Sequence, residues 1–231
     1  MHWSTDSRSL LASSIAAQSQ AGQSAQRLYR IDAQTGETSE VATAQGVDPQ
    51  SVDGSTLFFM RTGWPKSPVD AGWTLMAQSL PTGAEREIFR DNPPGHMSMR
   101  LSSDGQRIAV LSRRSPGERL LVMSESGQDL REVFQPAGGR PILDFALSAD
   151  GRYVIFSTSN KQAGDWELWR APVEGGALGK IALTMPRMRL FSMHPDGKRL
   201  AFASTDSRPA ELWLLENVLP APKPRSKPPV R

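Results

Sequence analysis

A short motif recurs along the chain at nearly constant spacing, and this periodicity limits the possible folds more than any other feature. Asp-Gly occurs at four places, and a weaker copy, Asp6-Ser7, precedes them. The five aspartates stand 47, 51, 46 and 46 residues apart. Asp-Gly between apolar runs is a strong hairpin signal, because glycine adopts positive φ without a clash and aspartate tolerates it. We expect structural turns at Asp53, Gly54, Asp104, Gly105, Asp150, Gly151, Asp196 and Gly197.

Each of these turns is followed by a short run with the alternation of a β-strand, such as Gln106–Ser112. Later runs such as Arg119–Ser124 and Trp166–Ala171 have the character of third strands, and Leu130–Phe134 that of a fourth. A period in the mid-forties with four short strands is typical of a propeller blade, which buries its faces against its neighbours. The sequence therefore predicts an all-β fold, a β-propeller of about five four-stranded antiparallel blades.

The predicted blades span about residues 1–44, 45–90, 91–135, 136–184 and 185–219. The last blade is incomplete, because prolines from Pro220 onward follow its third strand and proline resists ladder pairing. Residues 220–231 are rich in proline and basic residues, and we expect a disordered tail. The first blade begins at an inner strand, so an open or partial propeller is expected. Either residues upstream of a longer protein supply a blade and the closing strand, which we favour, or the arc closes poorly or through another chain.

The pattern apolar-Ser-x-Asp-Gly-(Lys/Arg)-x-(Ile/Leu)-Ala-(Phe/Val), to which Leu101–Val110 and Leu147–Phe156 are fitted, resembles the repeats of TolB-like β-propellers, relatives of the WD-repeat propellers. The run Glu211–Pro220 is similar to the last blade of bacterial proteins in which a propeller follows a kinase or winged-helix domain. The resemblance covers nearly the whole chain apart from the tail. It implies six blades or more, and a place as the C-terminal part of a bacterial signalling or regulatory protein whose upstream domain is missing here.

Composition sets further limits. The 231 residues suit one domain, and the absence of cysteine excludes disulfides and thiolate metal sites. Four basic residues lie in the tail, and subtracting them from the net charge of +3 leaves −1, so a nucleic-acid partner is not expected. No signal peptide or membrane-spanning run is visible. The location stays open: cytoplasmic as written, or periplasmic or otherwise extracytoplasmic if the chain comes from an exported protein.

The sequence gives no sign of catalytic chemistry. It contains no Gly-x-Ser-x-Gly elbow, no phosphate-binding loop and no kinase signature. His2, His96 and His194 lack the spacing of metal ligands, and the repeated aspartates fall at separate turns. We therefore predict a protein that is not an enzyme and has no metal site and no cofactor.

A binding surface remains. Segments that lead into the inner strands should ring the mouth of the central channel, and they carry a mildly cationic set: Asp48, His96, Arg140, Arg187 and Arg189. Arginine there suits an anionic ligand or an acidic peptide, although ordinary solvated loop charges would give the same pattern. The expected function is a non-catalytic module that binds a protein, a peptide or another ligand. The alternatives are an accessory propeller of a hydrolase or peptidase, and a truncated gene fragment.

Overall fold

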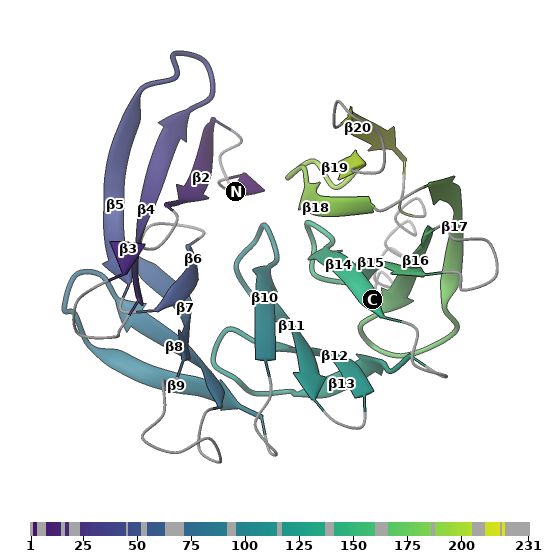
Figure 1. Cartoon of the computed structure of the whole chain (residues 1–231), viewed down its shortest axis with the longest axis horizontal. Coiled ribbons are helices and arrows are strands. Elements are labelled where there is room, and N and C mark those ends of the chain that lie inside the picture. The colour runs from purple at the N-terminus through teal and green to yellow at the C-terminus, as the bar shows by residue number, and fades with distance from the viewer. Residues whose placement is uncertain are drawn as a thin grey trace, which may run out of the picture.

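In the computed structural model, the described residues form twenty β-strands arranged as five antiparallel sheets around a common centre (Figure 1). The described residues are 2–3, 8–14, 17–18, 24–44, 46–51, 55–62, 72–91, 96–114, 117–136, 141–159, 166–185, 188–204, 211–217 and 219. None of these residues is helical, and accordingly none belongs to a helix that could cross a membrane. The chain is therefore an all-β propeller, as the repeat predicts.

Each sheet is one blade built from consecutive strands. The first blade contains β1 (His2–Trp3), β2 (Ser9–Ser13), β3 (Ala17–Gln18), β4 (Ser24–Asp32) and β5 (Thr38–Ala44). The second contains β6 (Val47–Gln50), β7 (Thr56–Thr62), β8 (Trp73–Ser79) and β9 (Glu85–Arg90). The third contains β10 (His96–Leu101), β11 (Arg107–Arg114), β12 (Gly117–Ser124) and β13 (Arg131–Phe134). The fourth contains β14 (Ile142–Leu147), β15 (Tyr153–Ser159), β16 (Trp166–Pro172) and β17 (Gly179–Met185). The fifth contains β18 (Met188–Met193), β19 (Arg199–Ser204) and β20 (Glu211–Glu216), and is the three-stranded one.

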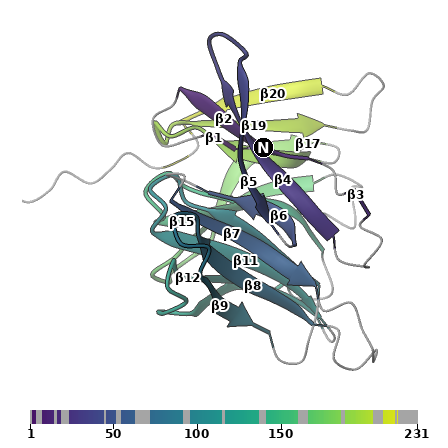
Figure 2. The same ribbon diagram turned by 90° about the vertical axis from the view of Figure 1, so that its left-hand side faces the viewer.

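The inner strands β6, β10, β14 and β18 surround the centre, and β5, β9, β13 and β17 lie at the outside (Figure 1). In side view the blades overlap as a stack of twisted sheets (Figure 2). The incomplete last blade that the prolines predict is present, because β20 is its outermost strand in the described part of the chain.

The Ser-x-Asp-Gly motif forms the turn between the inner and second strands, and the fourth blade shows how. The Ser148 amide donates to the Tyr153 carbonyl (2.8 Å), and the Gly151 amide donates to the Ser148 carbonyl (2.9 Å). The Ser148 hydroxyl accepts from the Tyr153 amide (2.9 Å) and donates to Asp150 Oδ1 (2.7 Å), which also accepts from the Arg152 amide (3.1 Å). Gly151 takes a positive φ of 65°. Serine and aspartate therefore fix the turn, and glycine alone supplies the left-handed conformation.

The same arrangement recurs in the neighbouring blades. In the third blade, Ser102 and Asp104 make the corresponding contacts. In the fifth, His194 replaces the serine, and its Nδ1 accepts from the Asp196 amide (3.2 Å). Burial acts to raise the pKa of Asp196, but the Lys198 amide and the Arg199 guanidinium outweigh it, and the pKa lies below its ordinary value. The Asp53-Gly54 and Asp6-Ser7 turns lie outside the described residues.

We expect Ser148→Ala to lower the free energy of unfolding by about 1–2 kcal/mol, because the Tyr153 amide loses its hydroxyl acceptor at a fully buried position. Urea unfolding followed by tryptophan fluorescence measures the change. Ser126→Ala, at an exposed position in the β12–β13 turn, is the control and should change stability by less than about 0.5 kcal/mol. Equal effects of the two substitutions would contradict the role of the motif.

The hydrophobic core consists of four clusters, one between each pair of successive blades. Residues four and six positions after the turn aspartate pack against the previous blade, as Ile108 and Val110 do. Residues five and seven positions after it pack against the next blade, as Ala109 and Leu111 do. Because side chains alternate along a strand, each internal blade has apolar side chains on both faces. Each repeat of the propeller therefore buries its faces against its two neighbours.

Candidate functional site

Three inner strands each carry a bulge in the wall of the central channel. One extra residue interrupts the register of β6 between Val47 and Gln50, of β14 between Ile142 and Phe145, and of β18 between Arg189 and Ser192. The strand β10 pairs with β11 without interruption. Bulges redirect side chains and are frequent beside functional sites.

Two of the bulges hold non-glycine residues with positive φ, Asp48 at 54° and Leu190 at 58°. Such a conformation is uncommon for residues with a Cβ, and for a branched side chain such as leucine it marks a strained position. Aspartate tolerates this conformation, so the strain falls on Leu190, and both residues line the channel.

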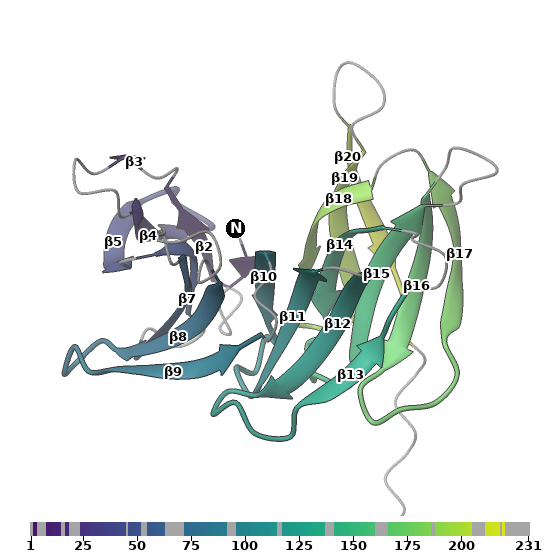
Figure 3. The ribbon, with the colours of Figure 1, turned by 60° about the horizontal axis from the view of Figure 1, so that its bottom comes forward.

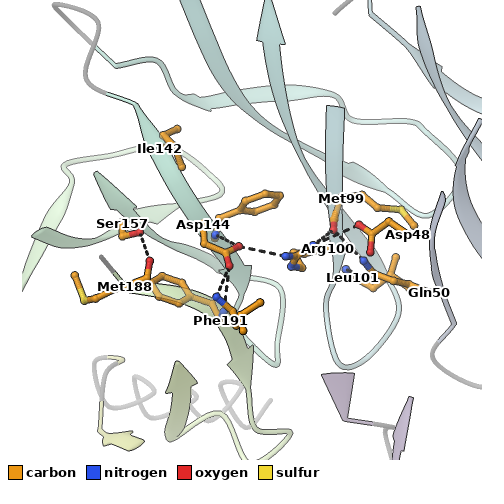
Figure 4. A network of polar contacts seen from close by, with 12 residues as sticks. Asp48, Gln50, Met99, Arg100, Leu101, Ile142, Asp144, Ser157, Met188 and Phe191 are labelled. Atoms are coloured by element: carbon orange, nitrogen blue, oxygen red, sulfur yellow. Dashed lines mark hydrogen bonds and ion pairs between the residues drawn. The ribbon is translucent and has the colours of Figure 1, made fainter. Parts of the chain in front are cut away.

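A chain of polar contacts, which we call the channel girdle, connects all five blades. Its side chains are Gln26, Asp48, Arg100 and Asp144, and it ends at the backbone of β18. The Asp48 amide donates to Gln26 Oε1 of the first blade (2.9 Å). Arg100 of the third blade lies between the carboxylates of Asp48 (3.4 Å) and Asp144 (3.2 Å), as Figure 4 shows.

Asp144 accepts more hydrogen bonds than any other side chain of the girdle. Its Oδ2 accepts from the amides of Leu190 (2.6 Å) and Phe191 (3.3 Å) in the fifth blade. Its Oδ1 accepts from the Phe145 amide (2.8 Å) and from Arg100. The side chain is only 11% exposed, so the charge depends on these donors rather than on water. Asp144 therefore joins three blades at one carboxylate.

The channel contains two hollows separated by the girdle. The larger, of about 430 Å³, is lined mainly by apolar side chains from the ends of the inner strands, and it extends to Leu10 of the first blade and Leu212 of the fifth. The smaller, of about 330 Å³, lies nearer the starts of the inner strands. Arg100 and Leu190 line both. We call the smaller hollow the mouth pocket.

The mouth pocket is positively charged, because Arg100, Arg113 and Arg189 line it together with one carboxylate, Asp144. Arg113 is bound to Glu118 (3.0 Å) and to the Ile142 carbonyl (2.9 Å). Arg189 is exposed, and its side chain makes no hydrogen bond or ion pair within the described part of the chain. Beside it, Leu190 is 71% exposed. The pocket thus offers an available guanidinium next to an exposed apolar side chain.

The structure brings two of the expected channel residues to this region and separates a third from it. Asp48 lines the larger hollow, and Arg189 lines the mouth pocket. His96 begins β10, but its ring packs against Trp73 at a centroid distance of 4.3 Å and lines neither hollow. Burial, and then the positive charge of Arg113, hold the pKa of His96 below its ordinary value. Arg140 and Arg187 lie outside the described residues.

Sequence reasoning missed the three residues that shape the site most, Arg100, Asp144 and Leu190. Asp144 carried a usable signal, since it is an acid inside the otherwise apolar run Ile142–Leu147 and must have donors if that run is buried. Arg100 carries no such signal, because it stands at a polar position of the alternating run His96–Leu101. Nothing in the sequence marks the bulge that exposes Leu190.

The comparisons with known proteins agree on the fold. No family model matches the chain, and no curated protein matches it in sequence. Among solved structures, TolB from Acinetobacter baumannii superposes with a TM-score of 0.67 at 16% identity, over 94% of this chain and 51% of that one. A second structure assigned to TolB, from Agrobacterium tumefaciens, gives 0.65 at 18% identity, over 93% of this chain and 75% of that one.

An enzyme is also among the similar structures. The S511A mutant of a puromycin hydrolase matches with a TM-score of 0.59 at 21% identity, over 90% of this chain but only 37% of the hydrolase. This chain therefore spans about half the length of the Acinetobacter TolB and a smaller part of the hydrolase. At these identities the likeness concerns architecture alone. On that basis, with five antiparallel sheets around one channel, the chain has the fold of the TolB-like β-propellers.

Proposed function

We propose that this protein is a non-catalytic binding module, and that its mouth pocket receives a protein segment in which a carboxylate stands next to an apolar side chain. The observation that carries the proposal is the pairing of Arg189 and Leu190. A cation with no partner in the described residues and an exposed leucine stand side by side at a channel wall. Arginine recognises carboxylates through paired N–H donors, so an acidic side chain is the complementary group.

The charge balance of the pocket supports an acidic partner. The one carboxylate in its lining, Asp144, is already bound by Arg100 and by three backbone amides. Arg113 is held by Glu118, which leaves Arg189 as the group that an incoming carboxylate meets first. Leu190 would lose most of its exposed apolar surface against the neighbouring side chain of the ligand, which favours binding.

The arrangement of the titratable groups supports binding rather than bond-making. The carboxylates of the two linings, Asp48 and Asp144, both contact Arg100 and are not free to act as a general acid and base. Among the described residues, no group of three histidines or acids is placed to hold a metal ion. A role as the C-terminal module of a bacterial signalling protein is compatible with this proposal.

The second candidate is an accessory propeller of a hydrolase or peptidase. The likeness to the puromycin hydrolase supports it, because this chain corresponds to a little over a third of that enzyme's length. In that role the channel would admit or exclude a substrate for a separate catalytic domain. Binding that depends on Arg189 in the chain by itself would favour the first candidate.

We expect a fluorescein-labelled peptide of alternating aspartate and leucine to bind the full chain. Arg189→Glu should weaken that binding about tenfold or more, because a charge-assisted contact is lost and the charge at position 189 is reversed. Fluorescence anisotropy measures the affinity. Arg152→Glu is the matched control, since Arg152 is exposed on the Asp150-Gly151 turn and lines neither hollow. A peptide of alternating lysine and leucine should bind weakly. Equal losses for the two variants, or equal affinity for the two peptides, would contradict the proposal.

A further inference from the structure

The strands that line the mouth pocket contribute side chains at two different spacings. A regular strand directs successive side chains to opposite faces, so its lining residues should stand two positions apart. This holds for β10, which has no bulge and lines the pocket with Ser98 and Arg100. In β14 the lining residues are 143–145, and in β18 they are the neighbours Arg189 and Leu190. The two strands with consecutive lining residues are both bulged.

The bulge of β18 brings Arg189 and Leu190 to the same wall. Two residues, Leu190 and Phe191, stand opposite the single residue Phe202 of β19, and such an insertion shifts the alternation of side chains. Leu190 consequently lines the pocket beside Arg189, while Phe191 is buried in the core between the fourth and fifth blades. The pairing of a guanidinium with an exposed leucine therefore depends on this bulge.

The backbone of the bulge is held from the neighbouring blade. Leu190 has a φ of 58°, a conformation that residues with a Cβ seldom adopt unless the surroundings impose it. The strands β14 and β18 lie side by side (Figure 3). From β14, Asp144 Oδ2 accepts from the amides of Leu190 (2.6 Å) and Phe191 (3.3 Å), as Figure 4 shows. One carboxylate thus binds both amides of the bulge.

The bulge of β6 provides an independent case of the same arrangement. Asp48 in that bulge has a φ of 54°, and its amide donates to Gln26 Oε1 of the preceding blade (2.9 Å). Leu190 likewise donates its amide to Asp144 of its own preceding blade. In both bulges, an acceptor from the preceding blade binds the amide of the residue with positive φ. The acceptor therefore accompanies the strained conformation.

We infer, on the basis of the proposed function, that Asp144 is the positioning residue of the mouth pocket. It holds the bulge of β18 in the conformation that places Arg189 and Leu190 on one wall, and so allows the pocket to bind a carboxylate and an apolar side chain together. Asp144 acts through the backbone of β18 and not through a contact with the ligand. Without its acceptor, β18 relaxes toward regular alternation, and Leu190 turns away from the wall that Arg189 lines.

Peptide affinities show whether Leu190 faces the pocket only when Asp144 holds it. Anisotropy with the fluorescein-labelled aspartate–leucine peptide gives the affinity of each variant. With Asp144 present, Leu190→Ala should weaken binding about fivefold, because a partly buried leucine contact is lost. In the Asp144→Ala chain, the same substitution should change the affinity less than about twofold. Loss of a carboxylate from the pocket favours the acidic peptide, so binding to the Asp144→Ala chain stays measurable.

A matched control separates positioning from stability. The side chain of Asp91 is only 3% exposed, it binds Arg119 (2.6 Å) and Ser112, and it lines neither hollow. Asp91→Ala should therefore destabilise the chain but leave the fivefold effect of Leu190→Ala intact. If Asp144→Ala does not fold, Asp144→Asn takes its place. Its single oxygen cannot accept from all four donors of Asp144, and the effect of Leu190→Ala should fall there too.

A second pair of variants tests the conformation of Leu190 with Asp144 in place. Valine keeps an apolar side chain, but branching at its Cβ disfavours positive φ, whereas methionine is unbranched there. Leu190→Val should therefore bind the peptide about fivefold more weakly than Leu190→Met. Equal affinities of these two variants would overturn the inference. An effect of Leu190→Ala that persists in the Asp144→Ala chain, or that disappears equally in the Asp91→Ala chain, would also overturn it.

The proposed function can survive each of those results. If Arg189→Glu still weakens the peptide in the otherwise unmodified chain, the mouth pocket binds as proposed and only the role of Asp144 is wrong. If the peptide does not bind the unmodified chain, both are wrong.

Discussion

The Asp144→Ala variant should lose about 3–5 kcal/mol of unfolding free energy, as expected when one partner of a buried ion pair is removed. The substitution leaves the amides of Leu190 and Phe191 without their acceptor and removes one of the two carboxylates bound to Arg100. Because these donors belong to the third and fifth blades, the loss should destabilise the ring as a whole. Urea unfolding measured by circular dichroism and by tryptophan fluorescence gives the change.

Two further variants keep this prediction testable if the alanine variant does not fold. Asp144→Asn retains one oxygen acceptor and should lose about 1.5–3 kcal/mol, the size of hydrogen bonds to a charged group. Glu174→Gln is the control, because Glu174 also joins two arginines, Arg107 and Arg131, but its side chain is 61% exposed. The unfolding midpoint of the control should stay close to that of the unmodified chain. A loss in Asp144→Asn no larger than in Glu174→Gln would show that the girdle does not hold the blades.

Phe156→Ala should cost about 3–5 kcal/mol, the usual range for truncating a buried phenylalanine. The side chain is fully buried between the third and fourth blades, and its ring stacks on Phe134 at a centroid distance of 4.5 Å. A cavity there separates two blades that contact through this cluster. Thermal unfolding and urea titration both report the loss.

Leu212→Ala is the matched control for this core prediction. It removes a comparable apolar side chain from the exposed face of the fifth blade and should change stability by less than about 0.5 kcal/mol. If Phe156→Ala cost less than about 1 kcal/mol, the contact between the third and fourth blades would not be a core interface.

The fold could be predicted from the sequence because each blade repeats the same short-range interactions. The Ser148–Tyr153 turn depends on residues within six positions of each other, and alternation in β11 sends Ile108 and Ala109 to opposite neighbours. Such local signals are visible in one sequence. The prolines after Leu219 likewise predict an incomplete last blade, and in the described part of the chain that blade has three strands.

The candidate site could be predicted only in part, because it depends on contacts between residues that are far apart in the sequence. Asp48 was expected at the channel, but its contact with Arg100 spans 52 residues and requires a bulge in β6. Asp144 reaches β18 across 46 residues through another bulge. Neither bulge contains a glycine that would mark it. The exposure of Leu190 likewise follows from its positive φ, which its sequence neighbours do not indicate.

We propose that an acidic, apolar peptide occupies the channel at the mouth pocket. The chain has no cysteine, so a single one can be introduced by Leu190→Cys, between the two hollows, or by Leu130→Cys on the outer surface as the control. The measurement is the rate of maleimide labelling with and without the aspartate–leucine peptide. We expect the peptide to slow labelling of the Leu190→Cys chain and to leave labelling of the Leu130→Cys chain unchanged. Unchanged labelling at position 190 with saturating peptide would contradict it.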